Sequence, residues 1–294
     1  MTSASGPPAS GTAYPQGGSG CDNLAVTDWY EKTTLPRFKS PPVIEVAMAV
    51  EFSPIAEMDF FKLSRLQAEW EDDYPAITEM PAAPPTQLTQ NTSPTVTFAL
   101  GGNLRRIWAA GKDGTLLLQT QNDRLILNWR KVSEETAYPG YFETLRGEFS
   151  IRWESLKQYL AKAGLPAPLP VLAEYNYVNA VALNATDAME DVVTVVRTPK
   201  DELPGEDRFT QFAIVREVTE SATDPYTTQI NISGQPQATP AGERQLYFTV
   251  VAKALIGTKT NDPLDALDAA HALASHSFAR IVTDKKQSEW GRIQ

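Results

Sequence analysis

A two-residue turn between two alternating segments is the feature that most constrains the fold of this chain. Asn122-Asp123 separates two segments of alternating apolar and polar residues, and this spacing favours a tight β-hairpin. The turn places Gln121 opposite Arg124, and this register assigns each side chain to a face of the sheet. One face then carries Leu116, Leu118, Leu125, Leu127 and Trp129, which we expect in the core, and the other carries Gln119, Gln121, Arg124, Asn128 and Arg130.

Similar patterns predict further short strands along the whole chain. Most are bounded by Gly, Pro, Asn or Asp residues, which favour turns and loops. Proline-rich or glycine-containing stretches at 81–94, 198–207 and 234–242 predict longer loops. The expected strands are Val43–Phe52, Thr95–Leu100, Arg105–Ala110, Thr115–Gln121, Arg124–Arg130, Val171–Val178, Val192–Val196, Phe212–Thr219, Thr227–Ser233 and Leu246–Ile256.

Apolar residues at helical spacing predict three helices, near residues 55–73, 141–163 and 263–282. A short helical segment is also expected near 185–191. Gly164 is suited to the position that follows the end of the second helix. Asp262 is the expected N-cap of the third helix, with Pro263 at its first position.

The two halves of the chain repeat the same order of elements. Each reads as a strand, a helix, four strands and a long helix, although the helix of the second half is only a short remnant. This order predicts an α+β fold with two similar lobes of antiparallel sheet, each packed by a long helix. This is a helix-grip-like pseudo-repeat, by analogy of fold alone. We expect a disordered Gly/Ser/Pro-rich lead-in at 1–34, a first lobe at 35–168 and a second at 169–294, the two forming one continuous globular unit.

Composition excludes several classes of function. The formal net charge of −10 is unfavourable for binding nucleic-acid phosphates or an anionic membrane, so neither partner is expected. Cys21 is the single cysteine and is either an inert exposed thiol or a modification site. Met1–Gly20 has no charge and no apolar run, which is unlike a secretion signal, and no apolar stretch is long enough to span a membrane. We expect a non-secreted bacterial protein of the cytoplasm.

Catalytic and metal-binding motifs are weak in this sequence. His271 and His276, the only histidines, are five residues apart, whereas metal-binding pairs on a helix usually lie three or four apart. His271 is on the apolar stripe of its helix, so it is either a buried core histidine or a functional group in a cleft. The acidic cluster at 69–73 is either a solvated surface or a cation site. We expect no metal, no cofactor and no catalytic residue.

The polar face of the predicted sheet is the main candidate for a binding site. Amide and guanidinium groups there are suited to bind a polar ligand or a partner protein. Glu174, Asn176 and Tyr177 lie on another strand and are expected to join them. The alternatives are an ordinary solvent-facing side of a half-buried sheet, or a catalytic cleft.

Short motifs follow one another along residues 35–292. They include RFKSPPVIEV from Arg37, QTQNDR from Gln119, NWR from Asn128, YPGY from Tyr138, an Ala-His pair ending at His271, and a final Trp-Gly pair. In this order they resemble a sporadically distributed bacterial protein family of unknown function. The resemblance implies no activity or cofactor, but it singles out Asn128, Arg130, Glu174 and His271. Ala272 departs from the glutamate expected after the Ala-His pair, which weakens a catalytic role for His271.

Three functional hypotheses follow. The first is a non-catalytic binding or accessory module that uses the polar sheet face. The second is a small-ligand-binding protein or an enzyme with its site between the sheet and the long helices. There Arg106, Arg124 or Arg130 would hold an anionic group, and Glu174 or His271 would transfer a proton. The third is a homodimer formed by a sheet edge or helix face, with tryptophans as anchors at Trp70, Trp153 and Trp290.

Overall fold

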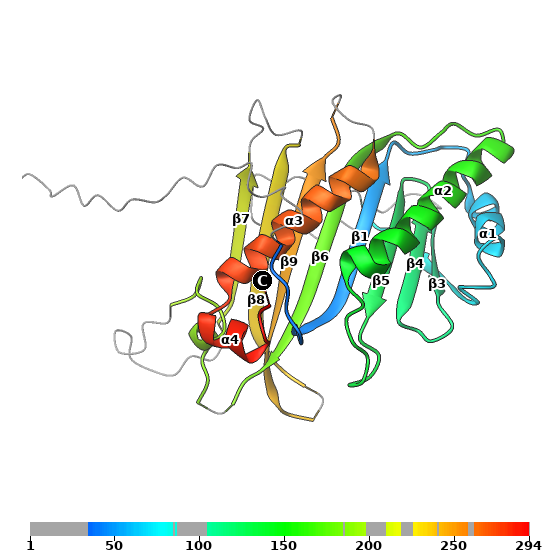
Figure 1. The fold of residues 1–294 in the computed structure, drawn as a ribbon. Helices are drawn as coiled ribbons and strands as arrows, with labels where there is room; N and C mark the ends of the chain where they lie inside the picture. The colour runs from blue at the N-terminus through cyan, green and yellow to red at the C-terminus, as the bar shows by residue number, and fades with distance from the viewer. Residues whose placement is uncertain are drawn as a thin grey trace, which may run out of the picture.

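The computed structural model describes residues 35–84, 86, 105–184, 186–197, 210–218, 226–239, 241–257 and 262–293. The strands of this part of the chain join into one antiparallel sheet of nine strands (Figure 1). Their order is β2-β3-β4-β5-β1-β6-β9-β8-β7. The prediction of an α+β protein with an antiparallel sheet is confirmed, and the sheet is continuous across the two halves of the chain.

The strands and helices are numbered in chain order. The strands are β1 (Val43–Phe52), β2 (Ala76–Pro81), β3 (Arg105–Ala110), β4 (Leu116–Gln121), β5 (Arg124–Arg130), β6 (Pro170–Ala182), β7 (Phe212–Val218), β8 (Thr228–Ala238) and β9 (Arg244–Leu255). The helices are α1 (Phe60–Ala68), the π-helix η3 (Tyr141–Leu145), α2 (Arg146–Lys162), the 3-10 helix η4 (Met189–Asp191), α3 (Pro263–Ile281) and α4 (Asp284–Glu289).

Local sequence signals predicted several element boundaries correctly. Gln121 pairs with Arg124 across the β4–β5 turn, as the two-residue spacing required. Asp262 caps α3 by accepting a hydrogen bond from the backbone N–H of Leu264 at 2.9 Å. Gly164, with φ of 67°, follows the end of α2, and the N–H of Leu165 donates back to Leu160 as in a Schellman motif.

Other expectations were wrong. Val192–Val196 is not a strand; it contributes one isolated bridge, from Val193 to Val282. The expected loop at 234–242 is largely strand, because β8 continues to Ala238 before the chain turns. The edge strand β2 and the short helix α4 were not predicted. The first helix is shorter than expected, and a π-helix occupies the first turn of the expected second helix.

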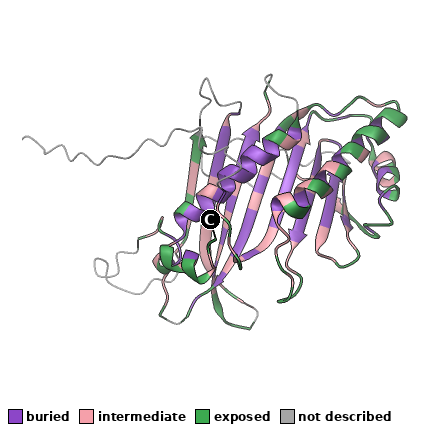
Figure 2. Ribbon diagram, viewed as in Figure 1, coloured by how far each residue is buried: buried purple, intermediate pink, exposed green. Residues whose placement is uncertain are grey.

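Helices α2 and α3 lie across one face of the sheet, which we call the helix face (Figure 1). The core lies between these helices and the sheet, and Figure 2 shows the buried residues concentrated on the strands and on the inner sides of the helices. Along β1, Val46, Met48 and Val50 point to this face and are fully buried. Their partners on β5 include Leu125 and Leu127, so the apolar face of the predicted hairpin is core, as expected.

The other side of the sheet, the opposite face, is polar. Ala83 and Thr86, just after β2, hydrogen-bond to side chains of β4 and β1 on this face. The chain therefore crosses from the edge strand β2 toward the centre of the sheet. This crossing helps to bury polar side chains that an open antiparallel sheet would leave in water.

Some expectations concern residues outside the described part of the chain. They include the lead-in at 1–34 with Cys21, the strand at Thr95–Leu100, most of the loop at 81–94 and the whole loop at 198–207. Among the described residues, no helix is both long and apolar enough to cross a membrane.

Candidate functional site

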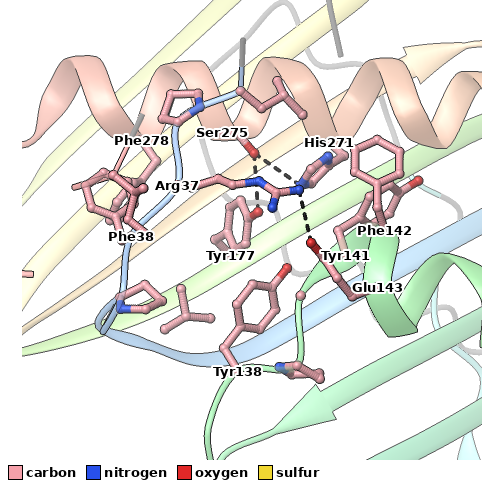
Figure 3. A pocket seen from close by; sticks show the side chains of 17 residues that line it. Arg37, Phe38, Tyr138, Tyr141, Phe142, Glu143, Tyr177, His271, Ser275 and Phe278 are labelled. Carbon is pink, nitrogen blue, oxygen red and sulfur yellow. Dashed lines mark hydrogen bonds and ion pairs between the residues drawn. The ribbon is translucent and has the colours of Figure 1, made fainter. Parts of the chain in front are cut away.

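A pocket of about 330 Å³ opens between the sheet, α3 and the segment that precedes β1 (Figure 3). Five parts of the chain that are distant in sequence form its walls. These are the segment 35–43, the turn and π-helix at 138–143, β6, α3 and the end of the described chain. Side chains that line the pocket include Arg37, Tyr138, Glu143, Tyr177, His271, Ser275 and Phe278.

Aromatic rings make up much of the pocket wall. The ring of Tyr141 stacks on that of His271 with centroids 3.9 Å apart. Phe38 meets Phe278 edge to face at 5.5 Å, and Tyr138 meets Tyr177 edge to face at 6.4 Å. These contacts hold the rings in fixed orientations. The pocket wall is therefore preformed by packed rings.

Asp268 fixes the position of the π-helix against α3. Its side chain is buried and accepts hydrogen bonds from the hydroxyl of Tyr141 at 2.7 Å and from Nε of Arg146 at 2.7 Å. The second guanidinium nitrogen of Arg146 donates to the other carboxylate oxygen at 3.0 Å. This bidentate ion pair gives the wall a defined geometry.

A chain of uncharged polar groups lies in the interior of the pocket. The hydroxyls of Tyr177 and Ser275 are 3.3 Å apart, and Ser275 Oγ is 3.2 Å from Nε2 of His271. Burial lowers the pKa of His271 to about 3 and raises the pKa of Tyr177 above its ordinary value. Both groups are therefore neutral at pH 7, and the interior carries no charge.

Charge is found at the rim of the pocket. The guanidinium of Arg37 forms an ion pair with Glu143 at 3.0 Å, and both side chains are about half exposed. Glu143 is in the π-helix, which begins after Gly140. Gly140 has φ of 83°, and a Cβ there would clash with the Glu143 carboxylate. Glycine at this position therefore allows the π-helix to place Glu143 at the rim.

The Ser275–His271 pair does not form a hydrolase triad. A serine nucleophile needs a histidine base near neutral pKa that a carboxylate orients. His271 has a strongly lowered pKa, and its Nδ1 has no hydrogen-bond partner among the described residues. The neighbouring Asp268 carboxylate is already bonded to Tyr141 and Arg146. The arrangement is better suited to hold a ligand than to activate a nucleophile.

The eight residues predicted as binding residues divide between the two faces of the sheet. Tyr177 and His271 lie at the pocket on the helix face. The expectation that Tyr177 joins Glu174 was wrong, because the two residues are three positions apart on β6 and point to opposite faces. The other predicted residues share the opposite face with Glu174 and are Gln119, Gln121, Arg124, Asn128 and Arg130.

Arg124 and Gln121 are occupied by contacts within the protein. Nε of Arg124 donates to Asp123 at 2.9 Å, and another guanidinium nitrogen pairs with Glu51 at 3.1 Å. Gln121 accepts from the backbone N–H of Ala83 at 2.8 Å. Both side chains are buried. Gln121 holds the segment after β2 against the sheet, and Arg124 pairs with two carboxylates of the protein itself.

A second network spans β3, β4, β5 and β1. Arg106 donates to Gln119 at 3.0 Å, Gln119 donates to Asn128 at 2.6 Å, and Asn128 donates to Glu45 at 2.8 Å. Each member therefore has a partner on a neighbouring strand. This network stabilises the register of the sheet and leaves its buried amides with little capacity to bind another molecule.

Arg130 and Glu174 are less fully paired. Arg130 donates from one terminal nitrogen to the carbonyl of Gly114 at 3.2 Å, while its buried Nε has no partner among the described residues. Burial raises the pKa of the Glu174 carboxyl, and the positive charges of Lys253 and Arg124 partly offset this effect.

Several pocket residues were not predicted as site residues. Arg37 and Tyr138 lie in two of the short motifs, but nothing in their local spacing indicates that these motifs meet. Ser275 is adjacent in sequence to His276, whereas it contacts His271 one helical turn away. Trp70 and Trp153, expected as anchors of a dimer, are buried in the core and are not available on the surface.

Several of the short motif segments meet at this pocket, whereas QTQNDR and NWR lie on β4 and β5 and do not line it. The N–H of Lys39 donates to the carbonyl of Gly291 at 3.1 Å, so the first and last motifs pair directly. The pocket lining takes residues from RFKSPPVIEV, from YPGY and from the Ala-His pair. In the described part of the chain, no group of three or more His, Cys, Asp or Glu residues is placed to hold a metal ion. No known protein-family model, curated protein or solved structure matches the chain.

Proposed function

We propose that this protein binds a small molecule in the pocket between α3, β6 and the segment before β1. The pocket itself carries the proposal. It combines a volume of about 330 Å³ with aromatic walls and a few convergent polar groups, which is the usual character of a small-ligand site. The π-helix at its wall is a second supporting feature, because π-helical turns are often found at functional sites.

The opposite face is a weaker candidate for the main site. Gln119, Gln121, Arg124 and Asn128 are each at most 6% exposed, and their hydrogen bonds are made inside the protein. A binding surface needs groups that a ligand can reach and whose bonding capacity is free. The pocket meets this condition at Arg37, whose ion pair with Glu143 engages one terminal nitrogen of the guanidinium.

Native mass spectrometry of the whole chain, purified from its own host, tests the proposal. We expect a small-molecule adduct on the wild-type protein. Ser275→Met places a longer side chain in the pocket and should abolish the adduct. Ser288→Met, on the exposed side of α4, is the matched control and should retain it. A bare wild-type monomer, or an adduct that persists in Ser275→Met, would contradict the proposal.

A docking function on the opposite face is a second candidate. Asn176 and Asn231 are partly exposed on this face, and their side-chain oxygens have no hydrogen-bond partner among the described residues. A partner protein that reaches these two side chains can supply the missing donors. A partner protein isolated with the wild-type chain should be lost from Asn231→Leu. If it binds both proteins equally, this face is not the docking site.

We also propose that the two halves of the chain are similar lobes, and the strand order supports this. β1 pairs with β5, the last strand of its own half, and β6 pairs with β9 in the same way. Each half then ends in a long helix. Amide hydrogen exchange tests whether the lobes are one unit: β1 and β6 should lose protection in the same unfolding event.

A further inference from the structure

We infer that the pocket takes a small aromatic carboxylate, with its ring between the aromatic walls and its carboxylate on Arg37. This inference rests on the proposed binding function and specifies the ligand class. It draws on three separate properties of the pocket: the placement of charge, the character of the walls and the available volume.

The placement of charge favours an anion at the rim. In Figure 3 the side chain of Arg37 extends across the pocket, with its guanidinium between Ser275 and Glu143. A guanidinium has five N–H donors in a planar fork that matches a carboxylate. The ion pair with Glu143 uses one terminal nitrogen of Arg37, so an approaching carboxylate finds free donors on the same group.

The ion pair with Glu143 does not prevent a ligand carboxylate from binding Arg37. Both side chains are about half exposed, and a pair of this kind contributes little to stability because water and salt screen it. When a ligand carboxylate binds Arg37, Glu143 can return to water. Arg37 is thus a cation that the structure orients toward the pocket without committing it to a buried partner.

The interior favours an uncharged, flat group. The polar atoms beyond the rim belong to Tyr177, Ser275 and His271, which are neutral at pH 7. A charged group placed there would lose its hydration without gaining a counter-ion. The rings of Tyr141 and Phe278 line the pocket, and an aromatic ligand packs well against such rings.

The volume limits the size of the ligand. About 330 Å³ is near the lower end of the range for small-molecule sites. One or two fused rings with a short acidic arm fill such a space, whereas a nucleotide or a long acyl chain does not. The probes we select are benzoate, phenylacetate and 2-naphthoate, each with its neutral carboxamide.

Isothermal titration calorimetry with these matched pairs tests the inference. We expect at least one carboxylate to bind the wild-type chain, and its carboxamide to bind about tenfold more weakly, because a charge-assisted hydrogen bond is lost. Arg37→Gln should weaken the carboxylate by a similar factor and leave the carboxamide nearly unchanged. Glu143→Gln should strengthen the carboxylate by a few-fold, since it frees Arg37.

The outcomes separate the ligand class from the binding function. If carboxylate and carboxamide bind equally, and Arg37→Gln changes neither affinity, the pocket binds small molecules but the carboxylate inference is wrong. If none of the six probes binds, and the native protein carries no adduct, the binding function itself fails. Arg37 and Glu143 are both about half exposed, so circular dichroism should show that each variant retains the fold.

Discussion

Tyr141 of the π-helix stacks on His271 of α3 with the two ring planes 15° apart. The hydroxyl of Tyr141 also donates to Asp268 on the same helix, so one tyrosine is held at two successive turns of α3. The stack is buried, and it excludes water from the imidazole. A neutral imidazole tolerates this environment, whereas an imidazolium would lose its hydration with no counter-ion in hydrogen-bonding contact.

This burial predicts an acid-sensitive fold. The pKa of His271 is lowered from 6.5 to about 3 in the folded protein, by burial first and by the nearby positive charge of Arg37 and His276 in addition, while Asp268 opposes the shift. Between these pH values the unfolded chain binds a proton at His271 that the folded chain does not. The free energy of unfolding should therefore fall as pH drops below 6.5, by up to about 1.4 kcal/mol per pH unit.

Urea unfolding at pH 7 and pH 5 measures this effect. His271→Gln removes the titrating group. The number of protons taken up on unfolding, which sets the pH dependence of the unfolding free energy, should therefore fall by about one. Ser275→Ala removes the hydrogen-bond partner of His271 but keeps the imidazole, so it should retain the wild-type slope. An unchanged slope in His271→Gln would mean that another group controls the acid sensitivity.

Asp268 should be among the most sensitive positions to substitution. Asp268→Ala removes the acceptor for Tyr141 and Arg146 and leaves a buried hydroxyl unpaired. We expect a loss of roughly 2–4 kcal/mol in the free energy of unfolding. A double-mutant cycle with Tyr141→Phe isolates the hydrogen bond between the two residues. A coupling energy near zero would show that the cost of Asp268→Ala does not come from its hydrogen bond with Tyr141.

The sequence predicted the sheet where the signal is local. The alternation around Asn122-Asp123 predicted the β4–β5 register correctly, because a two-residue turn leaves no freedom in the pairing. The same reasoning from alternating residues missed β2, an edge strand whose residues are nearly all exposed. Such a strand has no apolar alternation, since neither of its faces is in the core.

The pocket could not be predicted by the same reasoning. Arg37, Tyr138 and His271 are brought together by the pairing of β1 with β6 and by the packing of α3 on the sheet. These are long-range contacts, and no local spacing encodes them. For the polar face, the hairpin register assigned the side chains of β4 and β5 to one face correctly. It could not predict that Ala83 and Thr86 come to lie on this face and hydrogen-bond to Gln121 and Glu51.

The network on the opposite face predicts a pH-dependent variant. Asn128 donates to Glu45 at 2.8 Å and accepts from Gln119. Asn128→Asp places a second carboxyl group beside Glu45, so ionisation of both is unfavourable and the pKa of at least one is raised. The variant should be destabilised by about 2 kcal/mol or more at pH 7 and approach the wild type below pH 4.

A neutral substitution at the same position controls for this charge effect. Asn128→Leu breaks both hydrogen bonds without adding a charge, so its cost should be similar at the two pH values. Unfolding midpoints in urea at pH 7 and at about pH 3.5 compare the variants with the wild type. Equal costs for Asn128→Asp at both pH values would show that Glu45 is not its effective neighbour.

Gly140 should be required for the shape of the pocket. Its φ of 83° and ψ of 148° lie in a region that other residues rarely adopt, and a Cβ would meet the Glu143 carboxylate. Gly140→Ala should cost about 1–3 kcal/mol in the free energy of unfolding and move Glu143 away from Arg37. Any ligand bound at the rim should then bind with altered affinity.

Gly147 provides the matched control, since it lies in α2 with open space where a Cβ would be. Gly147→Ala should stabilise the protein by about 0.5–1 kcal/mol, because alanine favours a helix interior more than glycine does. Thermal and urea unfolding of the two variants tests whether Gly140→Ala lowers the free energy of unfolding and Gly147→Ala raises it. If Gly140→Ala is as stable as the wild type, the π-helix tolerates a side chain at its entry, and the rim geometry is not set by glycine.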